Sequence, residues 1–167
     1  MATQQGDLAL LDDPVAQELL RSTNLAKLAY IWTDGTPRVV PIWFEWTGQD
    51  IVLGTPPTAP KLKALRANPH VSLTIEDNAK DQALPLRGTA TVQMMPTVVS
   101  EYAAAARRYM GEEAGNAWVG EVGAIFSVRI AIRPEWVGVL DFQTRLPSAM
   151  QTVMAAATAD DSQQTPP

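Results

Sequence analysis

The chain has 167 residues, of which 46% are hydrophobic and 19% charged, enough for one folded domain with a buried core. It has no cysteine and one histidine, His70, which excludes disulfide scaffolds, thiolate or histidine metal sites and a Ser-His-Asp relay. The formal net charge of −5 argues against nucleic acid as a partner, and the lack of a signal sequence or of an apolar run of roughly 18 residues predicts a cytoplasmic protein with no membrane partner.

The N-terminal end predicts an arm followed by a helix. Residues 1–12 are polar and then leucine-rich, which is typical of a flexible arm. Asp13 and Pro14 then provide an acidic cap and a proline at the first helical position. We expect the folded domain to begin with this helix, which ends near Arg21.

A β-hairpin is expected next. Alternating apolar residues predict strands at 25–32 and 38–46, and the dipeptide Asp34-Gly35 between them favours a tight turn. Pro41 interrupts the second strand, because proline cannot donate to a ladder. Two interpretations stay open: a plain edge strand, or exposed main-chain groups that meet the rim of a flat ligand.

A proline-rich loop and a basic helix follow at residues 56–60 and 61–67. The helix carries Lys61, Lys63 and Arg66 in an otherwise acidic chain. Cations beside a helix start can hold a phosphate or carboxylate, although such a run is more often a solvated basic face. The neighbouring apolar strands favour the anion site over the solvated face.

The rest of the chain continues as strands with one long helix. Strands are expected at 51–55, 70–76, 83–94, 124–133 and 136–142, and the helix at 98–110. Gly88 permits a β-bulge that would redirect Arg87, whose alternative role is that of a surface cation. Residues 143–167 predict a flexible tail, so the domain is expected to span residues 13–142.

Six or seven closely spaced strands predict a mainly antiparallel β-barrel with flanking helices. The chain from about 25 to 142 resembles the split β-barrel flavin- and deazaflavin-dependent oxidoreductases related to pyridoxamine 5'-phosphate oxidase. The resemblance rests on four stretches: residues 34–44, residues 61–65 with 68–73, residues 86–90, and the Arg-Tyr-Met-Gly run at 108–111. The last of these is similar to a helix end in the deazaflavin-using branch.

The resemblance implies a cofactor, FMN or its deazaflavin alternative coenzyme F420, bound at the subunit interface of a homodimer. It places the cofactor ring along one strand, largely through backbone contacts, and the ribityl phosphate at a strand end and a lysine. The implied cofactor-binding residues are Arg38, Val39, Val40, Pro41, Ile42 and Trp43 for the ring, and Thr55 and Lys61 for the phosphate. The basic helix and the bulge add Lys63 and Arg87 as further candidate cations.

Three positions depart from the oxidase that gives the family its name. Pro60 stands where that enzyme has an arginine, Trp43 replaces a lysine, and Ala83 replaces a glutamine. These changes argue against vitamin B6 oxidation and leave the small-molecule substrate open.

The leading hypothesis is an FMN-binding oxidoreductase that transfers hydride between the flavin and a small organic substrate. Bound flavins carry such chemistry themselves, so the lack of an acid-base constellation is compatible with an enzyme, and no catalytic residue is named. The alternatives are an F420-dependent reductase, a non-catalytic protein that binds flavin or haem, and a fold whose pocket binds nothing.

Overall fold

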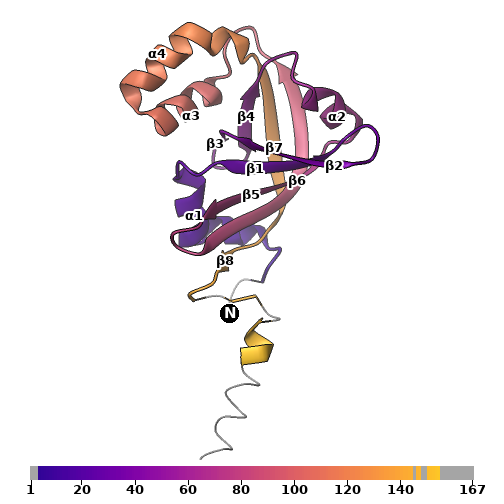
Figure 1. Ribbon diagram of the computed structural model, residues 1–167, viewed down its shortest axis with the longest axis vertical. Coiled ribbons are helices and arrows are strands. Elements are labelled where there is room, and N and C mark those ends of the chain that lie inside the picture. The colour runs from indigo at the N-terminus through magenta and orange to yellow at the C-terminus, as the bar shows by residue number, and fades with distance from the viewer. Residues whose placement is uncertain (1–3, 145, 148–149, 155–167) are drawn as a thin grey trace, which may run out of the picture.

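Figure 1 shows the computed structural model of the chain, which describes residues 4–144, 146–147 and 150–154. The strands are β1 (Ala26–Ile31), β2 (Pro37–Ile42), β3 (Glu45–Trp46), β4 (Ile51–Thr55), β5 (His70–Asp77), β6 (Gln82–Met94), β7 (Val128–Val137) and β8 (Leu140–Asp141). The helices are α1 (Pro14–Arg21), α2 (Lys61–Ala67), α3 (Ser100–Met110) and α4 (Glu112–Val122), with 3-10 turns η1 (Leu8–Asp12) and η2 (Gly123–Ile125).

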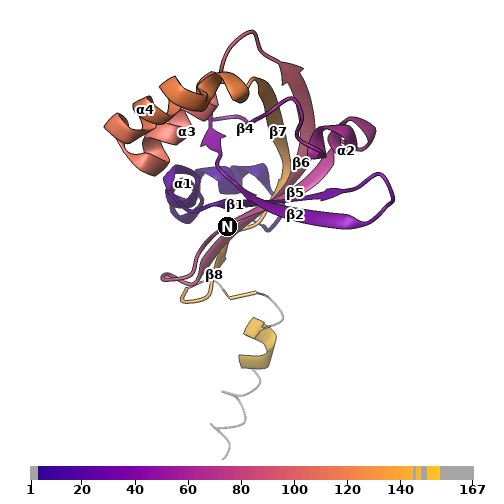
Figure 2. The ribbon, with the colours of Figure 1, turned by 45° about the horizontal axis from the view of Figure 1, so that its top comes forward.

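One curled antiparallel sheet forms the body of the protein. Among the described residues its eight strands follow the order β2-β1-β5-β6-β7-β4-β3, with β8 paired to β6. The strands at the two ends of this order, β2 and β3, are joined in the chain by only Trp43 and Phe44, so the sheet must curl until its two edges meet. Figure 2 shows β1, β2 and β5 running across the upright strands β4, β6 and β7. The expected split β-barrel is confirmed, with one or two strands more than expected.

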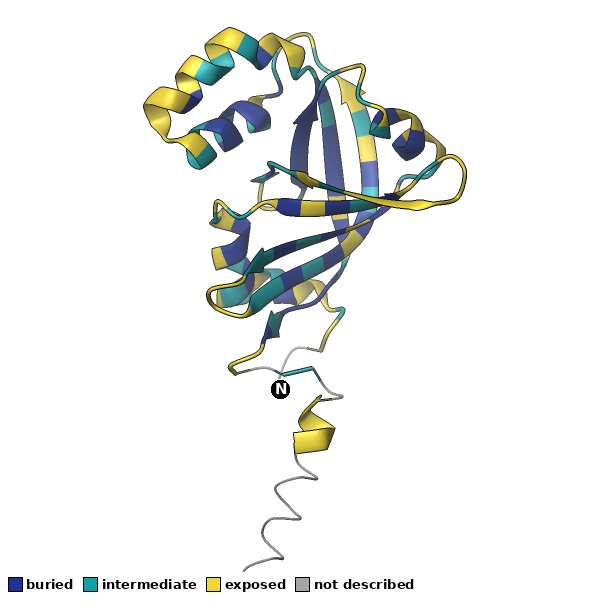
Figure 3. Cartoon of the chain, in the orientation of Figure 1, coloured by how far each residue is buried: buried dark blue, intermediate teal, exposed yellow. Residues whose placement is uncertain are grey.

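Two groups of buried side chains stabilise this arrangement. The larger core fills the inside of the curl and includes Leu28, Leu53 and Leu73, each at most 2% exposed. The smaller core lies between α3 and the other face of β4 and β7, where Val52 and Tyr102 are buried. Strand β4 is therefore buried on both faces, as Figure 3 shows, and it separates the barrel interior from α3.

The predicted hairpin is confirmed in detail. The Asp34 carboxylate accepts a hydrogen bond of 2.8 Å from the backbone N–H of Thr36, and Gly35 adopts a φ of +86°. Pro41 pairs with Lys27 of β1 on one side and has no strand on its other side, because β2 is an edge strand. Proline is tolerated there because a solvent-facing edge position needs no donor.

The predicted bulge at Gly88 is also confirmed, and it explains why β7 passes through a proline. The β6–β7 register shifts between Arg87 and Gly88, and Gly88 lies opposite Pro134. A Cβ atom at Gly88 would lie 2.1 Å from the Arg133 carbonyl oxygen, so only glycine fits this close approach. We expected two separate strands here, but a bulge accommodates the missing N–H of Pro134 within one strand.

Helix α4 was not predicted from the sequence. It packs against α3 as an antiparallel neighbour, and a Cβ atom at Gly115 would lie 2.5 Å from the Arg107 Cα. Both helices lie together beside β4 in Figure 1. Only Gly115 of α4 is buried, so the helix has no apolar stripe that the sequence pattern could have revealed.

The described part of the N-terminal arm touches the barrel. The Gly6 N–H donates to the Val137 carbonyl at 2.7 Å, and the Gln5 side chain forms two hydrogen bonds with the backbone of Val139. The division into arm, domain and tail stays a prediction, and most of the tail lies outside the described residues. Across the described ranges, none of the helices has the length and apolar character needed to cross a membrane.

Candidate functional site

A cavity of about 410 Å³ lies at the seam where the two edges of the sheet meet. The end of β2 and the residue after it contribute Pro41, Ile42 and Trp43 to its wall, and the end of β4 contributes Gly54 and Thr55. The rest of the wall comes from Leu25 before β1, Pro56 after β4, and Lys61, Tyr102, Trp118 and Phe126 in α2, α3, α4 and after η2. The seam thus brings together segments that lie far apart in the sequence.

The structure gathers half of the candidate cofactor-binding residues in this cavity. Its lining includes Pro41, Ile42, Trp43, Thr55 and Lys61. The other candidates, Arg38, Val39, Val40, Lys63 and Arg87, are not part of the lining. The chain therefore places an apolar strand end and a cation on the same cavity, which is the juxtaposition that the sequence predicted.

Lys61 is the charged residue of the cavity wall. It is partly buried, and desolvation by burial lowers the pKa of its ammonium group from the usual 10.5. Among the described residues, none accepts a hydrogen bond from Nζ or forms an ion pair with it. An anion in the cavity would supply the missing partner and stabilise the charged form.

Thr55 offers a second polar group in the same wall. Its side chain is only 2% exposed, and no residue in the described part of the chain hydrogen-bonds to its hydroxyl group. Among the described residues Gln82 Oε1 is the one fully buried side-chain polar atom without a partner, so the Thr55 hydroxyl group is not sealed off and is available to a ligand in the cavity. Lys61 and Thr55 together therefore form a polar corner without internal partners, as a bound phosphate requires.

Aromatic rings form another part of the wall. The Tyr102 ring stacks on Phe126 at 4.0 Å between centroids and lies 6.0 Å from the Trp43 ring. The Trp118 indole N–H donates to the Tyr102 hydroxyl oxygen at 2.9 Å. A planar ligand would find flat apolar surfaces here and a cationic corner at Lys61.

Arg108 and Tyr109 hold Trp43 in place from outside the cavity. The Tyr109 ring stacks on Trp43 at 5.1 Å with an interplanar angle of 8°, and its hydroxyl donates to the Asn24 carbonyl. The Arg108 guanidinium donates to the carbonyl oxygen of Phe44, the residue after Trp43, and pairs with Glu45 at 3.2 Å. The end of α3 thereby fixes the link between β2 and β3.

A methyl group at Gly54 should push α3 away from the cavity. A Cβ atom there would lie 2.5 Å from the Tyr102 Cβ, and both atoms belong to packed elements. We expect Gly54→Ala to lower the free energy of unfolding by about 1–2 kcal/mol, as overpacking does, measured by urea unfolding. Gly120→Ala is the control, because nothing lies within 4 Å of its position and alanine favours the helix. Equal stability of the two variants would contradict the close packing of α3 on β4.

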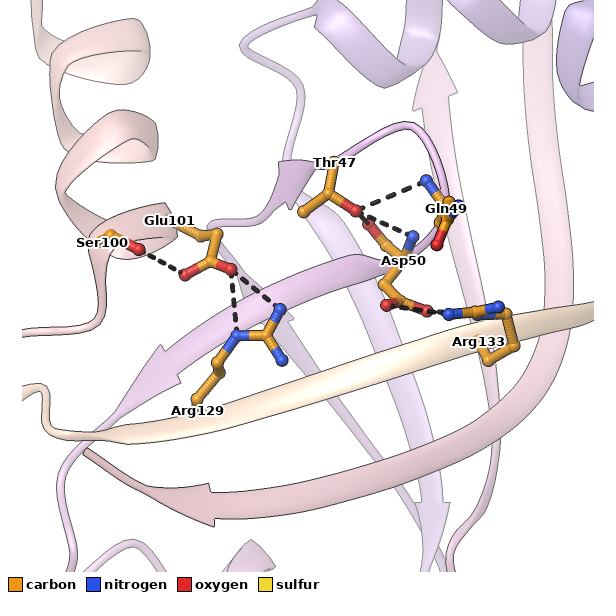
Figure 4. A network of polar contacts seen from close by, with 7 residues as sticks. All are labelled: Thr47, Gln49, Asp50, Ser100, Glu101, Arg129 and Arg133. Atoms are coloured by element: carbon orange, nitrogen blue, oxygen red, sulfur yellow. Dashed lines mark hydrogen bonds and ion pairs between the residues drawn. The ribbon is translucent and has the colours of Figure 1, made fainter.

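Two arginine-carboxylate pairs tie neighbouring elements to the outer face of β7 (Figure 4). Arg129 donates from Nε and Nη2 to Glu101 at 2.9 and 2.8 Å, which joins β7 to α3 next to Tyr102. Arg133 pairs with Asp50, at the turn before β4. Burial alone would raise the pKa of Glu101, but the hydrogen bonds from Arg129 and Ser100 outweigh it and the pKa is lowered.

This lowered pKa should make stability depend on pH in the acid range. A carboxylate with a depressed folded pKa stabilises the protein above its unfolded pKa, and the contribution is lost as pH falls through the folded value. We therefore expect Glu101→Gln to flatten the decline in thermal stability below about pH 4.5, measured by calorimetry. The exposed Glu113→Gln should keep the wild-type decline. Parallel curves for wild type and Glu101→Gln would contradict the assignment.

The remaining candidate residues lie on other surfaces. Arg38 is exposed and its guanidinium lies 4.2 Å from the Trp32 ring centroid. The Arg87 guanidinium lies 4.5 Å from the ring centroid of Trp136 in the neighbouring strand β7. On its other side, β6 pairs with β5, where Ser72 lies opposite Arg87. Val39 is 64% exposed on the free edge of β2. None of these residues lines the seam cavity, and their role stays a prediction.

A larger cavity of about 540 Å³ lies between η1, α1 and the turn before β4. It lacks a lysine, and its wall holds both Asp12 and Arg21, so it offers no unbalanced charge to an anion. The described part of the chain contains no group of three or more histidine, aspartate or glutamate side chains that could hold a metal ion. The seam cavity is therefore the better candidate.

Sequence reasoning missed three aromatic residues of the cavity wall, Tyr102, Trp118 and Phe126. Phe126 was expected inside a strand, but β7 begins only at Val128. Trp118 lies in the unpredicted helix α4, and Tyr102 was part of a helix whose facing partner was unknown. The available signal was Gly54 in β4, which allows Tyr102 to pack close to the strand. This signal can be interpreted only once α3 is known to lie against β4.

Comparisons with known proteins agree with this fold. The profile of the pyridoxamine 5'-phosphate oxidase family matches residues 13–140. No curated protein matches the chain in sequence. Among solved structures, an F420 reductase is 27% identical, with a TM-score of 0.61 over 72% of this chain and 93% of its own.

Two further structures share the fold at lower identity. A conserved hypothetical protein of Mycobacterium tuberculosis is 21% identical, with a TM-score of 0.62 over 83% of this chain and 90% of its own. The haem-storage protein HutZ of Vibrio cholerae is 19% identical, with a TM-score of 0.57 over 77% of this chain and 93% of its own. With the match spanning most of the domain, the chain belongs to the pyridoxamine 5'-phosphate oxidase family.

Proposed function

We propose that the protein is an oxidoreductase that holds a flavin-type cofactor in the seam cavity. The observation that carries this proposal is the polar corner of the partly buried Lys61 and the buried Thr55, whose side chains have no partner among the described residues, in the same cavity as several aromatic rings. Few ligands need a cation for a phosphate and flat apolar surfaces for a ring in one cavity. A flavin or deazaflavin mononucleotide needs both.

Each part of the cavity has a role toward such a cofactor. Lys61 and Thr55 would hold the phosphate, the first through its charge and the second through its hydroxyl group. Pro41, Ile42 and Trp43 would lie along the ring, and the stacked aromatic residues would exclude water from it. The cofactor supplies hydride transfer when bound, so the chain contributes binding and orientation, and we name no catalytic residue.

FMN is the leading cofactor and F420 the second candidate. The observation that favours F420 is the similarity to an F420 reductase, at 27% identity over 93% of that chain. F420 carries an acidic tail beyond its phosphate. Lys63 and Arg66 are exposed on the same helix as Lys61 and could meet that tail, despite the net charge of −5.

The proposed assembly is a homodimer with the cofactor between subunits. Strand β2 is a free edge on which Arg38, Val39 and Val40 lie outside the cavity of their own chain. In a dimer these residues would complete the site of one subunit or the other.

The test is a side-by-side titration of the purified protein with FMN and with F420, followed by reduction of the bound cofactor. We expect one cofactor per chain to bind, and the reduced complex to pass its hydride to an added organic acceptor. Binding without reoxidation by any acceptor would replace the enzyme with a storage protein. Binding of neither cofactor would contradict the proposal altogether.

A further inference from the structure

Two tyrosines of α3 contact the same tryptophan but differ in how their hydroxyl groups are used. Tyr102 and Tyr109 both stack on Trp43, at 6.0 and 5.1 Å between ring centroids. The Tyr109 hydroxyl donates its hydrogen to the Asn24 carbonyl oxygen at 2.9 Å. The Tyr102 hydroxyl accepts a hydrogen bond from Trp118 instead, also at 2.9 Å.

The direction of the Trp118 bond is fixed by chemistry. An indole N–H can only donate, so the Tyr102 oxygen must be the acceptor and its own hydrogen remains available. No residue in the described ranges accepts that hydrogen. Tyr102 is only 6% exposed, and a buried tyrosine hydroxyl group normally finds an acceptor.

The available hydrogen belongs to a residue of the cavity wall. Tyr102 and Trp118 both line the seam cavity, and their neighbours there, Trp43 and Phe126, offer only aromatic surfaces. A ligand that fills the cavity and displaces its water would therefore be the acceptor. The phosphate has its partners at Lys61 and Thr55, which leaves the ring of the ligand as the acceptor.

We propose that the Tyr102 hydroxyl group donates a hydrogen bond to a carbonyl oxygen or ring nitrogen of the bound flavin-type ring, and that Trp118 orients it. This inference rests on the proposed function. Flavin and deazaflavin rings carry several such acceptors, so a single fixed donor in an apolar wall would set the orientation of the ring. Tyr102 is then a binding and positioning residue.

The proton stays on Tyr102 under ordinary conditions. Burial raises the pKa of its hydroxyl group above the usual value of 10.0, although the hydrogen bond from Trp118 opposes this effect. The group is accordingly a donor at neutral pH, as the orientation of the ring requires.

The test compares FMN with riboflavin, which has the same ring but no phosphate, on the purified full chain. Tyr102→Phe keeps the aromatic stack and should weaken both ligands by the same factor, about 3- to 10-fold, the range of one neutral hydrogen bond. The absorption bands of the bound ring should also shift. Tyr30→Phe, the matched control, lies in β1 outside the cavity lining and should change neither the affinities nor the spectrum. If the wild type binds F420 instead of FMN, the same comparison is made with F420 and with the corresponding deazariboflavin, which lacks the phosphate.

The outcomes separate this inference from the proposed function. Wild-type affinities and spectrum in Tyr102→Phe would overturn the role of Tyr102 while leaving the cofactor proposal intact. A loss confined to the phosphate-bearing ligand would also overturn it, because the contact would then lie at the phosphate. Failure of the wild type to bind either cofactor would instead contradict the proposed function. Thermal unfolding of each variant confirms that it is folded before titration.

Discussion

Lys61→Ala should weaken cofactor binding by roughly 1.5–3 kcal/mol, the range for a hydrogen bond to a charged group, which corresponds to about a 10- to 150-fold higher Kd. The reason is that Lys61 is the charged group of the cavity wall and has no partner within the described part of the chain. The measurement is a fluorescence titration with FMN or F420, whichever the wild type binds. An unchanged Kd would remove Lys61 from the site.

Lys63→Ala is the matched control for this prediction. Lys63 lies on the same helix and carries the same charge, but it is exposed and outside the cavity. Loss of overall charge alone would affect both variants alike, whereas a contact inside the cavity affects only Lys61→Ala. Because burial lowers the pKa of Lys61, wild-type affinity should also fall as pH rises through that pKa, and Lys61→Ala should lose this dependence.

Arg108→Ala should lower the free energy of unfolding by about 1.5–3 kcal/mol, the range for hydrogen bonds that involve a charged group. Arg108 is 18% exposed, and its guanidinium joins the carbonyl oxygens of Ser22 and Phe44 to the carboxylate of Glu45. Its removal leaves these three acceptors without their donor at the link between β2 and β3. Urea unfolding followed by tryptophan fluorescence measures the loss.

Arg107→Ala separates this network from the general effect of charge at a helix end. Arg107 precedes Arg108 in the last turn of α3, so both cations interact with the same helix dipole. Within the described residues, Arg107 has no ion pair, and its replacement should cost far less. Equal losses in the two variants would show that the Arg108 contacts do not stabilise the seam.

The local features of the fold were predictable from the sequence because each depends on a few neighbouring residues. Asp34-Gly35 forms the expected turn, Asp13 caps α1 with Pro14 at its first position, and Gly88 forms the expected bulge. Features that depend on distant partners were not predictable. Helix α4 has no apolar stripe because it packs almost entirely on α3, and Pro134 stays within a strand only because Gly88 lies opposite.

The candidate site was predictable on one side only. Pro41, Trp43, Thr55 and Lys61 lie within 21 residues of each other in the chain, and their types indicate a flat surface and an anion site. The part of the wall from Tyr102 and Trp118 depends on how α3 and α4 pack over the end of β4, where Gly54 allows Tyr102 to approach. No local pattern in the sequence carries that information.

The most direct test of the central claim is a crystal structure of the protein with its cofactor bound. We expect electron density for the phosphate within hydrogen-bonding distance of Lys61 Nζ, and for the ring against Trp43 at the seam of the sheet. Density for the cofactor in the larger cavity beside α1, or at any site without Lys61 and Trp43, would contradict the account.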